Sequence, residues 1–424
     1  MTEQPVLIVG AGLAGLAAAV ALAKAGLCVR VVDHAPRPGG AVHRQPLPDA
    51  RSIATPAQAR RWQALMAGVA QWRARIEICC ETGFGGLDHR GAALLTGKGA
   101  ALLHPRAVVF ATGARERVQP RPGWTLPGVT TAGAVQSGLK TTAEPPAGRI
   151  LLAGSGPLLL AVGAELARLG VPPVAIIEAG RPFSHPIAAL GLPISYLAEA
   201  AGYLARLKLA RVPILTGHHL TRISAQGQAL VAQIDTPNGA IQISVDRIGL
   251  HDGIAPNDFG VPESPAIPVM RVGDCREALG ARVALADGRV GGARMAALLT
   301  GAAMNSAAPE VERERAVQTL LARIYAHDGA SRLSALPDDT VLCRCENRQL
   351  ADLRALGTAP TDRQLRLDGR FGMGPCQGRF CAEWVGRLAR PDQPALPRLG
   401  ADRWPSRPFS IADLVDAPEE SFPK

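Results

Sequence analysis

The fold is decided by residues 6–33, which read VLIVGAGLAGLAAAVALAKAGLCVRVVD. The apolar run Val6 to Val9 predicts a buried strand, and the Ala- and Leu-rich stretch up to Ala25 predicts a helix. A second apolar run follows and ends at Asp33. A G-x-G-x-x-G sequence at the turn, with an acid after the second strand, is typical of a β-α-β dinucleotide-binding unit.

Each glycine in this turn has a physical role. Gly10 permits the tight turn, Gly12 lets the backbone approach a pyrophosphate, and Gly15 lets the helix pack closely on the strand. The helix N-terminus then faces the phosphates, and Asp33 can accept a hydrogen bond from the adenosine ribose. Because all these parts coincide, we interpret the turn as a cofactor site and not only as a set of turn glycines.

A second unit of the same kind begins at Ile150. It carries Gly154-Ser-Gly156, but Leu159 stands where the third glycine is expected, and its next strand ends at Glu178. We expect the leucine to push the helix outward and to disfavour the usual pose of NAD. Three alternatives stay open: a nicotinamide nucleotide, another adenine nucleotide such as ATP, or an empty structural repeat. The candidate residues here are Gly154, Gly156 and Glu178.

Two further segments indicate a flavin nucleotide. Residues 108–113 predict a strand that runs into Ala-Thr-Gly, as where a two-domain flavoprotein crosses under its flavin. Val272-Gly-Asp274 precedes a predicted helix, which places an acid near the ribityl chain. The candidate FAD-binding residues are Gly10, Gly12, Leu13, Ala14, Gly15, Asp33, Gly40, Thr112, Gly113, Gly273 and Asp274.

Four cysteines near the C-terminus form a C-x-C pair and a C-x4-C pair: Cys343, Cys345, Cys376 and Cys381. Such pairs can converge four thiolates on one centre, which suits a [2Fe–2S] cluster or zinc. Structural zinc usually prefers C-x2-C, so the pattern favours the cluster, with zinc or unliganded cysteines as alternatives. A flavin together with an iron–sulfur cluster indicates electron transfer.

The length and composition of the chain limit the classes of function that it can have. The 424 residues suffice for two or three domains, and the net charge is +10. The arginines are interspersed with acids, as in Glu312-Arg313-Glu314-Arg315, so no nucleic-acid-binding face is expected. No stretch has the length of a membrane span, and the run from Val6 lacks the basic start of a signal peptide. We expect a cytoplasmic chain, or one peripheral at the inner face of the membrane, where reduced cysteines favour a metal site over disulfides.

Other catalytic chemistry is not indicated. No C-x2-C or C-x4-C follows the first dinucleotide unit, so the redox pair of disulfide reductases is missing. Cys28 and the adjacent Cys79 and Cys80 are expected to be inert, and Cys275 to pack near the flavin. His43 could approach the flavin, but no nucleophile–base–acid arrangement is found and no catalytic residue is assigned.

The predicted fold class is α/β, with two Rossmann-like domains of the two-domain flavoprotein type and a small α-rich C-terminal iron–sulfur domain. The expected boundaries are 1–140 with 254–308 for a discontinuous FAD domain, 141–253 for the second domain, and 309–424 for the cysteine domain with an irregular tail from Pro405. Helices are expected over 55–72, 186–208, 283–299, 310–327 and, capped by Asn347, 348–356.

Five motifs together carry a family resemblance: Pro38-Gly-Gly40, Ala111-Thr-Gly-Ala-Arg-Glu116, Pro122-Gly-Trp-Thr-Leu-Pro-Gly128, Cys343-Arg-Cys-Glu346 and Gly372-Met-Gly-Pro-Cys-Gln-Gly-Arg379. With them the chain resembles, over nearly its whole length, the FAD-binding α (A) subunits of heteromeric amine-oxidising dehydrogenases. These include opine oxidases, D-hydroxyproline dehydrogenase, dye-linked proline dehydrogenase and hydrogen cyanide synthase.

The resemblance implies that a separate β subunit, which is a flavoprotein of the glycine and D-amino-acid oxidase type, oxidises the amine. This α subunit would hold FAD and the [2Fe–2S] cluster and relay electrons. A small ferredoxin-like [2Fe–2S] γ subunit is further implied, as are an adenine nucleotide in the second domain and FMN at a subunit interface. The alternatives are an NAD(P)H-dependent flavoprotein reductase and a zinc-stabilised assembly subunit.

Two departures from the family pattern stand out. The segment after the first strand pair reads Gly39-Gly-Ala-Val-His-Arg-Gln45 where relatives often have G-G-Q-I-Y-R-Q, so the surroundings of the flavin ring are expected to differ. Relatives carry Thr before the Arg that precedes the G-M-G-P turn, and this chain has Gly369. The change leaves the cluster ligands intact but removes a neighbouring hydroxyl.

Overall fold

The structure is a computed structural model that describes residues 4–98, 100–262, 265–303, 308–392, 399, 404–406, 408–415 and 419–420. The chain divides into two compact units. Unit 1 consists of Met1–Arg115, Ile254–Arg315 and Gly400–Lys424, and unit 2 of Glu116–Gly253 and Ala316–Leu399. The first unit is therefore discontinuous in sequence. The three domain boundaries proposed from the sequence stay a prediction.

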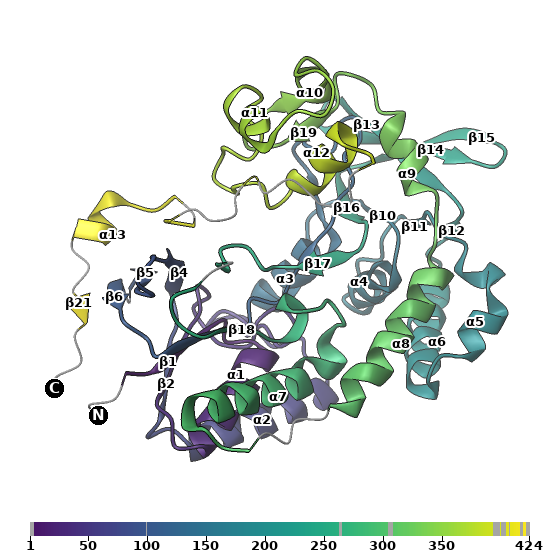
Figure 1. Cartoon of the computed structure of the whole chain (residues 1–424). Coiled ribbons are helices and arrows are strands. Elements are labelled where there is room, and N and C mark those ends of the chain that lie inside the picture. Colours follow the sequence, from purple (N-terminus) through teal and green to yellow (C-terminus); the bar gives the residue numbers. More distant parts are fainter. Residues whose placement is uncertain are drawn as a thin grey trace. The chain divides into compact units, whose positions relative to one another are not determined.

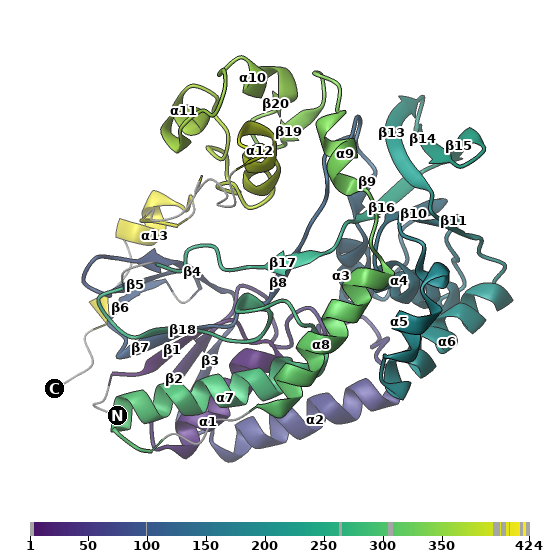
Figure 2. The same cartoon turned by 45° about the vertical axis from the view of Figure 1, so that its right-hand side comes forward.

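Unit 1 is built on a five-stranded parallel sheet in the order β18-β7-β1-β2-β3. Strand β1 (Val6–Val9) lies at its centre, in register with β2 (Val29–Val32) and β7 (Ala107–Phe110). All four residues of β1 are buried, as expected of a strand covered on both faces. The helices α1 (Leu13–Lys24) and α7 (Ala281–Thr300) lie side by side in both views (Figures 1 and 2).

The remaining elements of unit 1 complete this arrangement. One face of the sheet packs on α1 and α7, and the other packs on the small sheet β21-β6-β5-β4. The further bounds are β3 Ile76–Cys79, β4 Thr82–Leu87, β5 Ala93–Gly97, β6 Ala101–Leu103, β17 Ile254–Pro256, β18 Val269–Arg271, β21 Glu419–Glu420, α2 Pro56–Gln71 and α13 Ile411–Val415. The predicted β-α-β unit and the helix predicted over 55–72 are both present.

Glycines on α7 bring it unusually close to α1. A Cβ at Gly288 would lie 2.1 Å from the carbonyl oxygen of Ala14, and one at Gly292 would lie 2.6 Å from that of Ala18. No side chain fits at such distances, so the two helix backbones are in direct contact. This contact fixes the start of α7, and the turn before it, against the fingerprint helix.

Unit 2 contains a second five-stranded parallel sheet, in the order β12-β11-β10-β16-β9, and an antiparallel sheet β13-β14-β15. Strand β10 (Ile150–Gly154), α4 (Pro157–Arg168) and β11 (Ala175–Glu178) form the second β-α-β unit. The other bounds are β9 Val129–Thr131, β12 Ile214–Thr216, β13 His219–Gln226, β14 Ala229–Thr236, β15 Gly239–Val245, β16 Arg247–His251, α3 Ala132–Thr142, α5 Pro186–Leu190 and α6 Ile194–Leu209. Strand β8 (Ala114–Glu116) spans the sequence boundary between the units.

The cysteine-bearing part of unit 2 has its own small core. Helix α8 (Pro309–Ile324) leads into it, and a cluster around Leu342, Phe371 and Trp384 closes it. Its elements are α9 Gly329–Ser334, β19 Val341–Cys343, β20 Arg348–Gln349, α10 Leu350–Arg354, α11 Asp362–Leu367 and α12 Ala382–Ala389.

Two sequence predictions about helices were wrong. The single helix expected over 186–208 is two helices, α5 and α6, because Gly191 and Pro193 interrupt it. The helix expected from Arg348 begins at Leu350, and its N-cap is Gln349, not Asn347, whose φ of 51° belongs to a turn. Much of the tail from Pro405 lies outside the described residues. Among the helices described, none is long and apolar enough to cross a membrane.

Candidate flavin and cysteine sites

The fingerprint loop of unit 1 has no room for side chains. A Cβ at Gly10, whose φ is 111°, would lie 2.5 Å from the carbonyl oxygen of Ala111, and one at Gly15 would lie 1.9 Å from that of Gly10. Helix α1 starts at Gly12 without a side-chain cap. The first amides of the helix, including those of Leu13 and Ala14, therefore have no intrahelical acceptor and suit a phosphate.

Asp33 holds this loop from the neighbouring strand. Its carboxylate accepts hydrogen bonds from the backbone N–H of Ala11 at 2.7 Å and of Ala35 at 2.8 Å, and the residue is buried. Gly40 approaches the loop from the other side, since a Cβ there would lie 3.0 Å from the Cα of Gly12. His43, a candidate for contact with the flavin, is buried and its ring stacks on Trp62 at 5.7 Å.

The Thr112-Gly113 crossover is tied to the turn before α7. The hydroxyl of Thr112 donates to the carbonyl of Asn257 and lies 3.1 Å from Sγ of Cys275. The backbone N–H of Asn257 donates to the carbonyl of Gly113 at 2.9 Å. Burial raises the pKa of the Cys275 thiol, so this sulfur stays protonated and unreactive near neutral pH.

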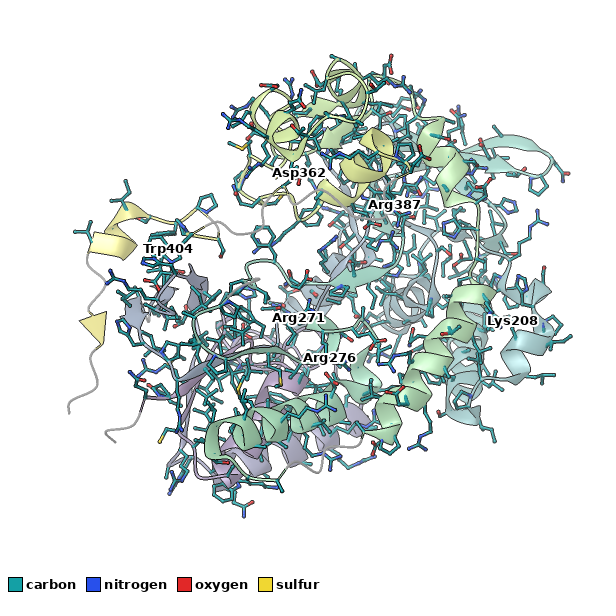
Figure 3. The ribbon with its side chains drawn as sticks, viewed as in Figure 1. Lys208, Arg271, Arg276, Asp362, Arg387 and Trp404 are labelled. Carbon is teal, nitrogen blue, oxygen red and sulfur yellow. The ribbon has the colours of Figure 1, made fainter. Side chains whose placement is uncertain are left out.

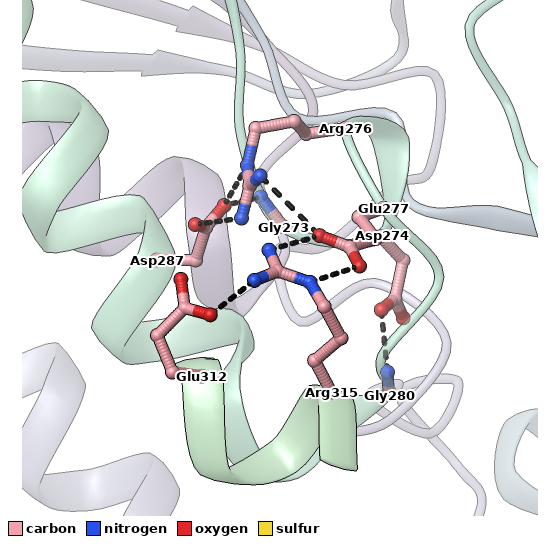
Figure 4. Close-up of polar contacts among 8 residues, drawn as sticks. All are labelled: Gly273, Asp274, Arg276, Glu277, Gly280, Asp287, Glu312 and Arg315. Carbon is pink, nitrogen blue, oxygen red and sulfur yellow. Dashed lines mark hydrogen bonds and ion pairs between the residues drawn. The ribbon is translucent and has the colours of Figure 1, made fainter. Parts of the chain in front are cut away.

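A network of charged side chains holds the Gly273-Asp274 turn (Figure 4). Buried Asp287, on α7, accepts the backbone N–H of Gly273 at 2.6 Å and the guanidinium of Arg276 at 2.7 Å. Asp274 itself accepts the backbone N–H of Gly280 at 2.6 Å, and burial raises the pKa of its carboxyl. Asp274 is thus presented at the N-terminus of α7 by a turn that Asp287 fixes.

The network extends to α8. Arg315 donates to both carboxylate oxygens of Glu277 at 2.7 Å, and it also pairs with Glu312 (Figure 4). The hydrogen bond from Arg315 lowers the pKa of the Glu277 carboxyl. These pairs are partly exposed, so each contributes little to stability individually. Within unit 1, they connect the turn of Asp274 to the first residues of α8.

The four cysteines of the quartet meet as two hydrogen-bonded pairs. Cys381 donates to Cys343, and Cys345 pairs with Cys376. The pKa of Cys343 is lowered to about 6, first by the hydrogen bond from Cys381 and further by backbone N–H groups including that of Gly372. Within the described residues, no group of three or more His, Cys, Asp or Glu side chains is arranged so that it could hold a metal ion.

The backbone near the four cysteines is closely packed at two glycines. A Cβ at Gly374 would lie 2.3 Å from the Cβ of Cys345, so only glycine fits there. A Cβ at Gly369 would lie 2.9 Å from the carbonyl oxygen of Leu365 and 2.8 Å from Phe371. The departure from threonine at position 369 therefore follows from close packing, and no hydroxyl could be accommodated there without rearrangement.

Two residues that the sequence did not single out hold the cysteine-bearing elements. Arg117 donates two hydrogen bonds to Glu383, a buried acid at the start of α12, and stacks over Trp384 at 5.3 Å. Trp124 donates from its indole Nε1 to the carbonyl of Val341 at 2.7 Å and so anchors β19. Arg117 and Trp124 could have been suspected only from their place in the family motifs or next to them.

In the second fingerprint loop, the side chain of Glu178 is hydrogen-bonded to the loop. The carboxylate of Glu178, 3% exposed, accepts hydrogen bonds from Ser155 Oγ at 2.6 Å, Gly156 N at 3.0 Å and Gly180 N at 2.8 Å. Ser155 Oγ also donates to the carbonyl of Tyr325, just after α8. Leu159 is fully buried. Glu178 is thus fully engaged by its own loop.

A cavity of about 310 Å³ lies beside this loop, within unit 2. Its wall is rich in basic and imidazole side chains, with two acids: Arg121, Arg222, Arg332, His218, His219, His327, Asp235 and Asp252. Burial, and then the charge of Arg332, lower the pKa of His219 to about 4, so this imidazole is neutral at pH 7. Arg121 is held by Asp252 at 2.5 Å.

All the residues predicted to bind FAD lie in unit 1, and the four cysteines lie in unit 2. It also places Gly154, Gly156 and Glu178 in one loop, with the acid turned inward. The α7 glycines were missed because they contact α1, which is distant in sequence. Asp287 was missed because its bond to Gly273 exists only once the turn has folded back onto α7.

The chain is similar to known proteins over both units. Residues 4–274 match the family model described as pyridine nucleotide-disulphide oxidoreductase. The A subunit of opine oxidase from Agrobacterium tumefaciens (strain Ach5) is 30% identical, over 97% of this chain and 91% of that protein. The HcnB subunit of hydrogen cyanide synthase from Pseudomonas aeruginosa is 32% identical, over 90% of this chain and 91% of that protein.

Solved structures show the same fold. L-proline dehydrogenase from P. horikoshii superposes with a TM-score of 0.62 at 16% identity, over 97% of this chain and 79% of that one. Bacillithiol disulfide reductase from Bacillus cereus gives 0.52 at 15% identity, over 70% of this chain and 99% of that one. The predicted α/β fold class with Rossmann-type sheets is confirmed, and the chain is an FAD-dependent oxidoreductase. The predicted resemblance is confirmed as well: the chain belongs to the pyridine nucleotide-disulphide oxidoreductase family, among the relatives of the opine oxidase A subunit and the hydrogen cyanide synthase HcnB subunit.

Proposed function

We propose that this chain is the electron-transfer subunit of a heteromeric amino-acid or opine dehydrogenase. It holds FAD in unit 1 and a [2Fe–2S] cluster on Cys343, Cys345, Cys376 and Cys381. It accepts electrons from a partner flavoprotein that oxidises an amine such as hydroxyproline, proline or an opine. The FAD ligands are the eleven residues predicted from the sequence.

The observation that supports the proposal is the pairing of Cys343 with Cys381 and of Cys345 with Cys376. A [2Fe–2S] cluster needs four thiolates and is tuned by backbone N–H groups directed at sulfur. Both features suit this site, since the backbone N–H groups of Gly372, Glu346 and Cys345 donate to Cys343. Gly374 leaves space beside Cys345. Zinc stays the alternative occupant, because it also accepts four thiolates.

The residues of the chain have distinct tasks in this function. When bound, FAD and the cluster supply two-electron and one-electron redox chemistry. The amides at the start of α1 bind the phosphates, and Asp33 orients the ribose. Asp274 binds the ribityl chain, held in place by Asp287. Cys275, protonated and buried, takes no part in thiol chemistry.

Substrate oxidation is assigned to a partner. The relatives are named as subunits of opine oxidase and hydrogen cyanide synthase. We therefore infer a β subunit of the glycine and D-amino-acid oxidase type, a small ferredoxin-like γ subunit, and FMN at a subunit interface. The sequence of this chain predicts no catalytic acid–base group, which agrees with that division of labour.

For the second domain, a nicotinamide nucleotide, another adenine nucleotide and an empty structural repeat stay open. The carboxylate of Glu178 accepts backbone N–H groups of its own loop, as that of Asp33 does in the first loop, so the two acids are held alike. The neighbouring cavity has three arginines in its wall, of which Arg121 pairs with Asp252 and Arg332 with Asp235. Leu159, in place of the third glycine, is the feature that weakens the alternative of a self-sufficient NAD(P)H-dependent reductase.

The proposal is tested on the purified full chain by iron, acid-labile sulfide and FAD analysis with electron paramagnetic resonance. We expect two iron atoms and one FAD per chain, with a signal of a reduced [2Fe–2S] cluster after dithionite. Cys376→Ser should lose iron and keep FAD, whereas Cys28→Ser, a buried cysteine of unit 1, should keep both.

Three results would contradict the proposed function. Zinc in place of iron would support the alternative of a zinc-stabilised assembly subunit. Rapid anaerobic bleaching of the flavin by NADH alone would restore the reductase alternative. Loss of FAD together with iron in Cys376→Ser would show that the two sites are not separate.

A further inference from the structure

The two pairs of the cysteine quartet differ in their surroundings. Cys343 and Cys381 are each 1% exposed, whereas Cys345 is exposed and Cys376 is half-buried. Cys343 is the last residue of strand β19, and Cys381 is the N-cap of helix α12. Because buried side chains are held by close packing, the position of the buried pair depends on where β19 and α12 are held.

Strand β19 is anchored by a tryptophan that lies far away in the sequence. The indole Nε1 of Trp124, a buried side chain, donates to the carbonyl of Val341 at 2.7 Å, two residues before Cys343. The preceding Gly123 is pressed against β13, since a Cβ there would lie 1.9 Å from the carbonyl oxygen of Ile223. The indole therefore projects from a fixed backbone, and its hydrogen bond fixes β19 in turn.

Helix α12 is anchored in a similar way by an arginine. Arg117 donates to the carboxylate of Glu383 at 2.9 Å, two residues after Cys381, and that carboxylate side chain is only 7% exposed. The centre of the Trp384 ring lies 5.3 Å from the guanidinium carbon of Arg117 and 5.7 Å from that of Arg387, which is also on α12 (Figure 3). The buried ion pair and the stacked ring hold the start of α12 against residue 117.

Both anchors belong to one short segment, residues 117–124, which is tied to the second parallel sheet of unit 2. Asp252 directly follows β16, and its carboxylate accepts the backbone N–H of Gln119 at 2.8 Å and the guanidinium of Arg121 at 2.5 Å. The backbone carbonyl of Arg117 also accepts the N–H of Asp252 at 3.0 Å. The end of β16 therefore fixes the segment that carries both anchors.

We propose that Trp124 and Arg117 are positioning residues for the cluster, and that through them the parallel sheet of unit 2 sets the placement of Cys343 and Cys381. The inference rests on the proposed function, because it requires a [2Fe–2S] cluster on the quartet. The potential of such a cluster depends on backbone N–H groups directed at its sulfur atoms, and the N–H of Gly372 is directed at Cys343. A displacement of β19 changes these hydrogen bonds, so the anchors tune the potential of the cluster as well as holding its ligands.

The test compares the full FAD-loaded chain with two variants at equal iron content. Trp124→Phe removes one indole N–H, and Asp252→Ala removes the acceptor that holds residues 119 and 121. We expect Trp124→Phe to release iron to a chelator roughly two- to tenfold faster than the parent chain, the range expected for one lost hydrogen bond. Both variants should shift the midpoint potential of the cluster in the same direction and alter its electron paramagnetic resonance spectrum, while the potential of the flavin stays unchanged.

Two controls separate positioning from a general loss of stability. Trp72→Phe also removes an indole N–H, but Nε1 of Trp72 has no hydrogen-bond partner among the described residues, so this variant should match the parent chain. Asp252→Asn keeps an oxygen for the N–H of Gln119 and should restore most of the parent potential.

Three results would overturn the inference while leaving the proposed function intact. They are a Trp124→Phe chain with the potential and iron release of the parent, an equal change in Trp72→Phe, and an unchanged cluster in Asp252→Ala. The last result would mean that the tryptophan acts locally and not through the sheet. A parent chain without the signal of a [2Fe–2S] cluster would instead overturn the proposed function, and this inference with it.

Discussion

The link between Asp287 and the Gly273-Asp274 turn yields a quantitative prediction. In Asp287→Ala the buried N–H of Gly273 loses its carboxylate acceptor at 2.6 Å, and Arg276 loses its partner at 2.7 Å. An unsatisfied buried donor costs roughly 1–3 kcal/mol. The guanidinium of Arg276 is 34% exposed and is rehydrated, so its loss adds only about 0.5–1 kcal/mol.

We therefore expect Asp287→Ala to lower the free energy of unfolding by about 1.5–4 kcal/mol. Asp287→Asn retains an oxygen for the Gly273 N–H and loses only the charge, so about 1 kcal/mol is expected. Because the turn presents Asp274, the dissociation constant for FAD should rise at least tenfold in the alanine variant, since about 1.4 kcal/mol corresponds to a factor of ten. Urea denaturation and titration of flavin fluorescence measure the two quantities.

Asp258→Ala is the matched control, because Asp258 also pairs with an arginine, Arg271 at 3.1 Å, but both side chains are largely exposed. Its effect should stay below about 1 kcal/mol. The reasoning is refuted if Asp287→Ala costs no more than Asp258→Ala, or if the asparagine variant is as damaging as alanine. Either result would mean that the turn is held by its own backbone.

Three further predictions concern both units. Arg117→Met, which leaves the carboxylate of Glu383 buried without its cation, should release iron faster than the parent chain in a chelator assay while FAD content is unchanged. Gly288→Val should abolish FAD binding and soluble expression, because its side chain would collide with the Ala14 backbone; soluble holoprotein would contradict the close contact. His219 has a folded-state pKa of about 4 and an unfolded value of about 6.5, so the unfolded state binds more protons between these values. The free energy of unfolding should therefore be constant above about pH 6.5 and fall as the pH drops toward about 4, and His219→Gln should reduce that slope in denaturant titrations.

The sequence predicted most of the elements because local signals and global fold agree. The fingerprint at Gly10, the acid at Asp33 and the apolar runs beside them each specify one conformation, and the structure has them all. The prediction of a single helix over 186–208 was wrong, because it gave more weight to the apolar periodicity than to Gly191 and Pro193, which break the helix.

Contacts between side chains that are far apart in the sequence were harder to predict. Arg117 and Glu383 are 266 positions apart, and nothing in the pattern of either segment indicates the other. The inward orientation of Glu178 also escaped prediction, because an acid at the end of this strand fits a ribose contact and a self-bonded loop equally well. Long-range pairing of polar groups is decided by tertiary geometry, which a single sequence does not encode in its local periodicity.

The backbone contact between α1 and α7 has a consequence for the order of events during synthesis. The fingerprint strand and helix leave the ribosome before α7, so the surface of α1 that Gly288 and Gly292 cover stays exposed until α7 has been made. Most of unit 2, from Glu116 to Gly253, is made in the interval. At roughly 5–20 residues per second that interval lasts tens of seconds. The backbone contact that fixes the fingerprint helix can therefore form only after residues 116–253 have been synthesised.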